Sequence, residues 1–240
     1  MNQDIQLSII IPAFNEEDRI VPTLSHTTDY LAGKPYGSEV IVVSDGSRDD
    51  TVAVVENFTA GPNIRLKALE YTPNRGKGYA VKYGMTRASG QIVMFMDADY
   101  AVPIKYCEEG MALIHEGFDI AIASRALSAS RVKAHQNRPR ELSAKIYTLI
   151  QNHYLGIDYT QCGFKLFRRE AAHRLFREQR LDSVIFDPEI LWLAKQAGYR
   201  IAQFPVEWTH VENSRIQYDS LRKSLFVFQE LLRIKSLHKA

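Results

Sequence analysis

Short apolar runs alternate with amphipathic stretches through the first half of this chain. Each run has the length of a strand that is buried on both faces, and polar or small residues follow most of them. The predicted strands are Leu7–Ile11, Glu39–Val43, Ile64–Leu69, Ile92–Met96 and Asp119–Ala123. Alternation of strand and helix is typical of βαβ units, so we expect an α/β fold with a mostly parallel sheet and flanking helices.

The pattern changes after Arg125. A basic segment, Arg131–Lys145, leads into a helix that ends near Leu155, and a mixed segment after it is compatible with a strand that returns to the sheet. Two further helices are expected over 168–179 and 186–197, followed by an alternating segment whose Pro205 places it at a sheet edge or end. The tail, 220–238, predicts an amphipathic helix.

Two carboxylates, Asp97 and Asp99, end the fourth predicted strand, with only Ala98 between them. Ligands of open α/β sheets bind at the carboxyl ends of the strands, so this pair would face the ligand. Carboxylate oxygens suit Mg²⁺ or Mn²⁺, which in turn hold phosphates. The alternative is a solvated loop and helix cap ahead of Pro103.

Charge is distributed unevenly along the chain, although the composition is ordinary for a globular protein, with 45% hydrophobic and 24% charged residues. Residues 1–123 contain 10 Lys+Arg and 17 Asp+Glu, a net charge of −7, whereas residues 124–240 contain 20 and 11, a net charge of +9. An acidic half and a basic half suggest carboxylates for a metal and cations for an anionic partner.

The cysteines and the N-terminus indicate a cytoplasmic protein. Cys107 and Cys162 are far apart and match no zinc or redox spacing, so we expect reduced thiols. The N-terminus carries acid and passes directly into a strand, which does not resemble a signal peptide. No apolar run approaches the ~18 residues of a membrane span.

Four motifs occur in the order that is found in family 2 inverting glycosyltransferases with a GT-A fold, and the chain resembles that family. They are Pro12-Ala13-Phe14-Asn15-Glu16, Ser44-Asp45-Gly46-Ser47-x-Asp49, Arg75-Gly76-Lys77-Gly78 and Asp97-Ala98-Asp99. Downstream, Thr160–Phe167 and Phe186–Glu189 resemble the dolichyl-phosphate glucosyltransferase branch most, and polyprenyl-phosphate mannose synthases next. The resemblance implies one domain, 1–240, with a nucleotide-sugar half, 1–125, and an acceptor half, 126–240.

The resemblance implies a nucleotide-sugar site that includes Pro12, Phe14, Glu16, Asp45, Lys77, Asp97 and Ala98. Asp45 is placed to accept a hydrogen bond from the base, although the family usually has Asp where this chain has Ser44. Glu16 has a second interpretation as a first-turn acid of a helix that opens after Ala13. Lys77 would lie beside the pyrophosphate. No Walker loop or dinucleotide-binding glycine motif is present, which argues against a triphosphatase or a dehydrogenase.

The chemistry of sugar transfer assigns Asp97 and Asp99 to a divalent metal, because a metal neutralises the charge that develops on the leaving nucleoside diphosphate. Some relatives have a third ligand two residues later, but Ala101 here cannot bind a metal. Asp99 is therefore a candidate catalytic residue, together with Arg125 and Asp187.

Arginines are the expected contacts of an acceptor phosphate, since the planar guanidinium fits phosphate oxygens. By resemblance to mannose synthases, Arg125 is one such residue, and Arg138 or Arg140 is the second. Arg131 and Lys133 are expected to be solvated.

Asp187 has two interpretations. It stands where a relative with a hydroxyl acceptor carries its base, but Asp187-Pro188-Glu189 is also a complete helix-start signature. Gln161 and Lys165 are further candidate site residues. Trp192, Tyr199 and Trp208 are expected in the core.

These observations predict an inverting transferase that moves a hexose from UDP-glucose or GDP-mannose to a polyprenyl phosphate at the cytoplasmic face of a membrane. The first alternative is the same donor site with a sugar or other hydroxyl acceptor. The second is a basic module that binds nucleic acid or an anionic surface; the aromatic residues occupy mostly apolar-periodic positions, so we expect no nucleic-acid partner.

The tail helix also has two interpretations. Apolar residues such as Leu225, Phe228 and Leu232 recur at helical spacing among basic residues, which suits a helix that lies in the membrane interface. The alternative is that its apolar stripe packs on the domain core or on a second copy of the helix.

Overall fold

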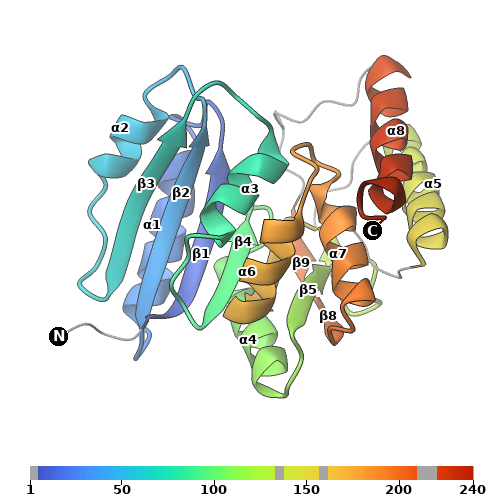
Figure 1. The fold of residues 1–240 in the computed structure, drawn as a ribbon. Coiled ribbons are helices and arrows are strands. Elements are labelled where there is room, and N and C mark those ends of the chain that lie inside the picture. The colour runs from blue at the N-terminus through green and yellow to red at the C-terminus, as the bar shows by residue number, and fades with distance from the viewer. Residues whose placement is uncertain (1–4, 133–137, 157–161, 210–220, 240) are drawn as a thin grey trace.

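The computed structural model describes residues 5–132, 138–156, 162–209 and 221–239 (Figure 1). In these residues, seven strands form one sheet in the order β3-β2-β1-β4-β7-β5-β8. The strands are β1 (Ile5–Ala13), β2 (Gly37–Asp45), β3 (Ile64–Tyr71), β4 (Ile92–Met96), β5 (Ile120–Ser124), β7 (Phe164–Arg168) and β8 (Ile201–Pro205). All five strands predicted for the first half are confirmed, within one to two residues at most ends.

The sheet is parallel except at β7. This strand lies between β4 and β5 and runs antiparallel to both, while β5 and β8 are parallel to each other. The expected strand that returns to the sheet is therefore confirmed, and β8 is an edge strand as Pro205 indicated. Two short strands, β6 (Arg131–Val132) and β9 (Glu207–Trp208), form a second, parallel pair.

Helices cover both faces of the sheet (Figure 1). They are α1 (Ile20–Ala32), α2 (Thr51–Glu56), α3 (Lys77–Met85), the 3₁₀ helix η1 (Ile104–Tyr106), α4 (Cys107–His115), α5 (Arg138–Leu155), α6 (Arg169–Glu178), α7 (Phe186–Gln196) and α8 (Leu221–Leu237). Among the described residues, no helix is both long and apolar enough to span a bilayer.

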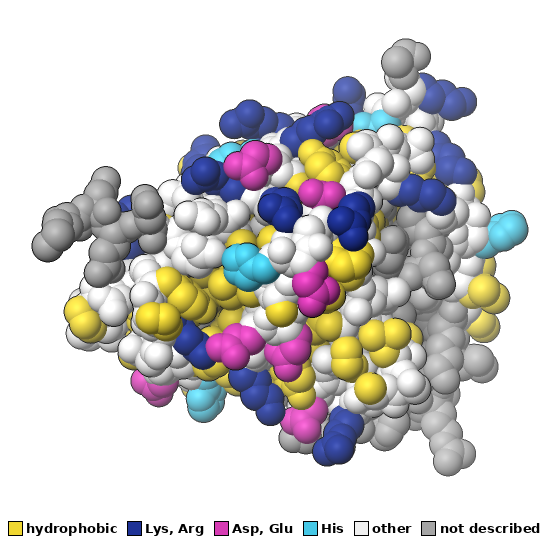
Figure 2. All heavy atoms as spheres, turned by 90° about the horizontal axis from the view of Figure 1, so that it is seen from below, with side chains coloured by type: hydrophobic (Ala, Val, Ile, Leu, Met, Phe, Trp, Pro, Cys, Tyr) yellow, Lys and Arg dark blue, Asp and Glu magenta, His cyan; other side chains and the backbone are white. Residues whose placement is uncertain are grey.

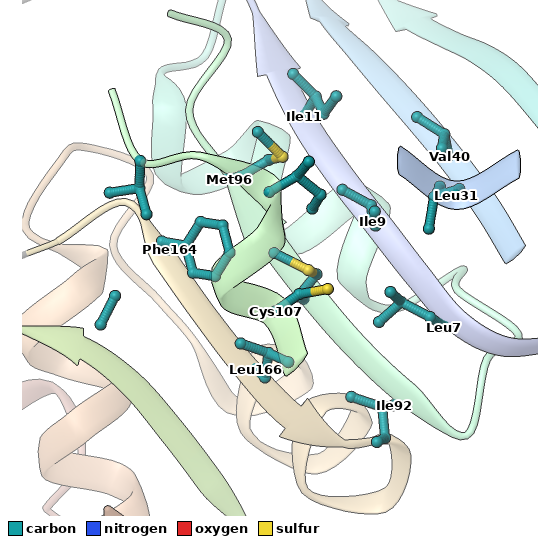
Figure 3. Packing of buried hydrophobic residues seen from close by; sticks show 14 of the residues in the cluster. Leu7, Ile9, Ile11, Leu31, Val40, Ile92, Met96, Cys107, Phe164 and Leu166 are labelled. Carbon is teal, nitrogen blue, oxygen red and sulfur yellow. The ribbon is translucent and has the colours of Figure 1, made fainter. Parts of the chain in front are cut away.

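Alternate residues of the central strands enter two separate cores. Ile9 and Ile11 of β1 pack with α1 and α4, together with Met96 and Phe164 (Figure 3). Ile10, between the two, packs instead in the cluster that includes residues of α3, α6 and α7. Because successive side chains of a strand point to opposite faces, an uninterrupted apolar run is what a sheet covered on both sides requires.

The first helix begins later than the sequence pattern predicted. α1 starts at Ile20 and has no acidic residue in its first turn, so the interpretation of Glu16 as a helix acid is wrong. The backbone turns at Asn15, whose φ is 54°, a left-handed conformation that asparagine tolerates. The Glu16 N–H then donates to Thr51 Oγ1 at 2.9 Å, which holds this loop against the start of α2.

Candidate active site

The carboxyl ends of β1, β2 and β4 bring the predicted donor residues to one edge of the sheet, the upper edge in Figure 1. Asp97 and Asp99 directly follow β4, as predicted. Tyr100 then adopts a left-handed φ of 55°, and its ring stacks on His26 with centroids 4.9 Å apart. The turn holds Asp99, whose Oδ1 accepts the Ala101 N–H at 3.1 Å.

The Asp97–Asp99 pair is arranged for a cation. Burial and the neighbouring charge of Asp97 raise the pKa of Asp99 above its ordinary value. Two carboxylates, completed by phosphate oxygens of a substrate, are a donor set that Mg²⁺ accepts. Ala101 contributes a buried methyl group, and no cluster of three or more acidic, histidine or cysteine side chains suitable for a metal occurs in the described residues. The pair therefore fits a divalent ion that phosphate oxygens of a substrate help to hold.

Lys77 is brought to this pair by a close packing of backbones. It is the first residue of α3, between Gly76 and Gly78, and its Nζ lies 2.5 Å from Asp97 Oδ1. A Cβ at Gly76 would lie 2.6 Å from the Asp182 carbonyl oxygen, and one at Gly78 only 2.5 Å from that of Ser183. Glycine is required at both positions for the loop to reach the segment before α7.

The charges of three carboxylates act on the Lys77 ammonium group. Burial alone would lower the pKa of Lys77, but Asp97, Asp99 and Asp187 together raise it above its ordinary value. The lysine is therefore charged at neutral pH. A fixed cation beside the carboxylate pair is suited to the oxygens of a diphosphate.

Gly163, which the sequence did not single out, lies directly against Asp97. Its carbonyl oxygen accepts the Asp97 N–H at 3.1 Å, and a Cβ built on it would lie 2.1 Å from Asp97 Oδ2. The antiparallel direction of β7 explains the contact, because the residues that precede β7 must enter the sheet at the same edge as the carboxyl end of β4. Only a residue without a side chain leaves room for the Asp97 carboxylate.

The Gly163→Ala variant is expected to fold and to lose about tenfold to a hundredfold in transfer rate, because the added methyl group forces the Asp97 carboxylate from its position. Initial rates and calorimetric Mn²⁺ affinity in the presence of nucleotide measure the effect. Gly33→Ala is the matched control, since the nearest atom to its Cβ is 3.8 Å away. Unchanged rate and affinity in Gly163→Ala would show that the position of Asp97 does not matter.

Asp45 is buried and already accepts four hydrogen bonds from its own chain. They come from Tyr71 Oη at 2.8 Å, the Arg75 N–H at 2.7 Å, Asn74 Nδ2 at 3.0 Å and the Gly76 N–H at 2.9 Å. A carboxylate has about four lone-pair sites, so these donors occupy it. Asp45 thus fixes the loop that carries Lys77, and its contact with the base stays a prediction.

The remaining donor candidates belong to the first loop. Pro12 is the second-last residue of β1, Phe14 is 36% exposed, and Glu16 is buried in an ion pair with Arg19 at 2.6 Å. Ala98 is also buried, and its carbonyl oxygen accepts Thr23 Oγ1 at 2.6 Å. The loop thus presents the Phe14 ring to solvent at the site edge, where a planar base could stack on it.

Asp187 pairs with a buried lysine and does not cap α7. It lies in the first turn of α7, whose N-cap position is Ile185, so the prediction that it caps the helix is wrong. Lys165 Nζ lies 2.7 Å from Asp187 Oδ1 and 2.8 Å from Oδ2, and it donates to the Cys162 carbonyl oxygen at 2.6 Å. The Lys165 side chain is fully buried and that of Asp187 nearly so. Together they form a desolvated ion pair at the border of the site.

Arg125 follows β5 and stacks on a tryptophan that was expected in the core. Its guanidinium carbon lies 4.6 Å from the centre of the Trp208 ring. The Trp208 ring packs on the core that contains α1 and α4, so the expectation that Trp208 is a core residue is partly met. The ring also lines a small pocket next to Asp97. The pocket is lined by Met96, Asp97, Ala101, Val102, Cys162, Gly163, Phe164 and Trp208. Arg125 thereby lies beside a residue that lines the pocket next to Asp97, and its contact with an acceptor phosphate stays a prediction.

The other acceptor candidates are only partly located. Arg138 and Arg140 lie in the first turn of α5, and their side chains are outside the described part of the chain. Gln161 also lies outside the described residues. Burial raises the pKa of the Cys162 thiol to about 11, so this cysteine is a neutral wall residue of the pocket.

Comparison with known proteins decides the family. The model of glycosyl transferase family 2 matches residues 8–176, which include the first loop, the Lys77 loop, the carboxylate pair and β7. The chain belongs to glycosyl transferase family 2. This transferase is 35% identical over 250 residues to dolichyl-phosphate beta-glucosyltransferase ALG5A of Trichomonas vaginalis, covering 98% of this chain and 74% of the relative. It is 32% identical over 230 residues to dolichyl-phosphate beta-glucosyltransferase of Homo sapiens, covering 88% and 69%.

Solved structures confirm a GT-A-like fold. The transferase superimposes on glucosyl-3-phosphoglycerate synthase from Mycobacterium tuberculosis in complex with UDP, with a TM-score of 0.68 and 21% identity over 98% of this chain and 82% of that one. A second structure of that enzyme contains Mn²⁺, UDP and glucosyl-3-phosphoglycerate and gives a TM-score of 0.68 at 18% identity, with the same coverage of both chains.

Proposed function

We propose that this transferase moves glucose from UDP-glucose to a polyprenyl phosphate, with inversion at the anomeric carbon. The observation that carries the proposal is the buried ion pair of Asp187 and Lys165. A hydroxyl acceptor needs a general base to remove its proton, and the residue in that position is committed to a lysine. A phosphate acceptor is largely ionised at pH 7, having a second pKa of about 6 by analogy with phosphorylated side chains, and needs no base.

The donor half of the mechanism rests on Asp97, Asp99 and Lys77. The two carboxylates would hold Mg²⁺ or Mn²⁺, which supplies Lewis-acid stabilisation of the leaving diphosphate when bound. Lys77, next to Asp97, adds a permanent positive charge where the bond between sugar and phosphate breaks. The Mn²⁺ and UDP in the structural neighbour support this assignment.

The acceptor half rests on cations. Arg125 is held by Trp208 at the pocket, and Arg138 and Arg140 begin α5. We assign them to the acceptor phosphate, which must approach the anomeric carbon from the face opposite the diphosphate for inversion to occur. The names of the relatives, dolichyl-phosphate beta-glucosyltransferases, support a lipid phosphate as acceptor and glucose as the sugar.

Transfer assays that combine each donor with each acceptor test the proposal. Purified enzyme with Mn²⁺ is given UDP-glucose or GDP-mannose, each with polyprenyl phosphate, the matching polyprenol or a simple sugar. We expect transfer only from UDP-glucose to polyprenyl phosphate. Efficient transfer to the polyprenol or the sugar, with none to the phosphate, would establish the hydroxyl-acceptor alternative.

The Arg125→Ala variant is expected to raise KM for polyprenyl phosphate by about tenfold to a hundredfold, the worth of one hydrogen bond to a charged group. KM for UDP-glucose should change less than twofold, because the assigned donor contacts lie elsewhere. Steady-state kinetics with each substrate varied in turn measure the difference. Arg131→Ala, an exposed arginine of β6, is the control and should change neither constant. An equal rise in both constants for Arg125→Ala would remove Arg125 from the acceptor site.

A further inference from the structure

Exposed large apolar side chains are concentrated on two helices. Eight such residues are exposed among those described, and six of them lie on α5 and α8. They are Ile146, Leu149, Ile150, Leu225, Phe226 and Leu232, with exposed fractions of 50%, 72%, 40%, 59%, 50% and 55%. We call this set the α5–α8 apolar face. Single exposed apolar residues need no explanation, but a contiguous group of this size marks an interaction site.

The two helices are side by side, at one end of the molecule in Figure 1. The Tyr147 and Phe228 rings meet at 5.6 Å, and Tyr154 Oη donates to the Leu232 carbonyl oxygen at 2.9 Å. On α5, Ile146, Leu149 and Ile150 have the spacing of one helix face. On α8, Leu225 and Leu232 are seven residues apart, so they also share a face. The exposed residues therefore line adjoining ridges of a two-helix surface.

The core-facing side of α8 is separate from this surface. Val227, Leu231 and Ile234 are buried in the second core, so the alternative that the tail packs on the domain is confirmed for this side of the helix. Core packing thus accounts for one apolar side of α8 and leaves Leu225 and Leu232 unexplained. An amphipathic helix that serves the core alone would carry polar residues at these outward positions.

The charge of this part of the chain indicates what binds the α5–α8 apolar face. Residues 124–240 carry a net charge of +9, and α8 alone contains Arg222, Lys223, Arg233 and Lys235. Arg233 is 60% exposed at its side chain. A symmetric contact between two copies would bring the same basic helix against itself, which is unfavourable. An anionic bilayer attracts each basic residue near its surface and accepts apolar side chains below its headgroups.

The lower face of the molecule in Figure 1 has a different, mixed composition. Figure 2 views the transferase from below Figure 1, the side on which β1 begins, and shows basic, acidic and apolar side chains interspersed over that face. Mixed charges of this kind are typical of a surface that stays in water.

We propose that the α5–α8 apolar face inserts into the interface of an anionic membrane. The proposal rests on the proposed lipid-phosphate acceptor and specifies how the site meets it: α5 begins at Arg138, one of the residues assigned to the acceptor phosphate. α8 is also connected to the Lys77 loop. Ser183 Oγ donates to Glu230 Oε2 of α8 at 2.6 Å, and Ser183 packs against Gly78. His238 Nε2, beyond the end of α8, lies 2.6 Å from Glu189 of α7.

Vesicle flotation of the full chain tests the proposal. The probe is a vesicle of phosphatidylcholine with roughly 30% phosphatidylserine, compared with phosphatidylcholine alone. We expect the wild type to float with the anionic vesicles and the triple variant Leu149→Ser, Leu225→Ser, Leu232→Ser to bind them at least tenfold more weakly. Val21→Ser, a substitution of a 38% exposed apolar residue on α1, is the control and should bind like the wild type.

Activity measurements distinguish the proposal of membrane insertion from the proposed function. The triple variant should glucosylate a water-soluble short-chain polyprenyl phosphate at the wild-type rate and a long-chain lipid phosphate in vesicles at least tenfold more slowly. Equal flotation of the triple variant and wild type, or no flotation of the wild type, overturns the proposal. A dimeric wild type whose triple variant is monomeric, with vesicle binding unchanged, assigns the face to self-association. Vesicle binding without transfer to any polyprenyl phosphate would instead refute the proposal that polyprenyl phosphate is the acceptor.

Discussion

The Asp99→Asn variant is expected to keep the fold and to lose transfer activity by about a hundredfold to a thousandfold. The substitution removes one carboxylate of the pair that we assign to the metal and changes little else in shape. It also removes the repulsion from Asp97 that helps to raise the pKa of Asp99, so thermal stability should be equal to that of the wild type or slightly higher.

Activity with Mn²⁺, activity with excess EDTA and the melting temperature measure this expectation together. Asp29→Asn, an exposed aspartate on α1, provides the matched control for loss of one negative charge and should behave as the wild type. Full activity of Asp99→Asn, or of the wild type in EDTA, would exclude a metal-dependent mechanism.

The Lys165→Met variant is expected to lose about 3–5 kcal/mol in the free energy of unfolding. Methionine fills much of the space of the lysine but leaves the buried Asp187 carboxylate without its cation. The double variant Lys165→Met, Asp187→Asn should recover most of this loss, since it removes both charges from the interior. Urea unfolding of the four forms of the cycle measures the coupling between the two side chains.

The same double variant decides what Asp187 does. Loss of a general base lowers a rate by roughly 10²–10⁴-fold, whereas an ion pair that only positions the loops can be replaced with a much smaller loss. We expect transfer to polyprenyl phosphate within about tenfold of the wild-type rate, given that the double variant folds. A folded double variant that is inactive with polyprenyl phosphate would support Asp187 as a catalytic base.

The strands and the carboxylate pair were predictable because their signals are local. An apolar run bounded by loops identifies β4, and the two aspartates that end it lie where the crevice rule places ligands. The start of α1 was not predictable in the same way. Helix-favouring acids follow β1, but Asn15 turns the chain and the start of α2 holds the Glu16 backbone, a contact between residues 35 apart in sequence.

The parts of the site that the sequence missed depend on β7. Gly163 appears in the sequence as one small residue in a mixed segment, and its contact with Asp97 exists only because β7 pairs with β4. The partner of Asp187 could not be inferred either, since Asp187 lies in α7 and Lys165 reaches it from β7. Trp208 was expected in the core from its apolar character, and its second role requires the position of Arg125. Spatial neighbours from distant segments leave no periodic signal.

The position of β7 also has a consequence for how the chain is made. β4 and β5 follow each other in the sequence, but the strand that joins them comes about forty residues later (from Ser124 to Phe164). A nascent chain that has emerged as far as Ser124 therefore has two strands whose common partner has not been synthesised. We therefore expect their unpaired edges to be open to association with other chains during this interval. The surroundings of Asp97 are completed only when Gly163 and β7 have been synthesised.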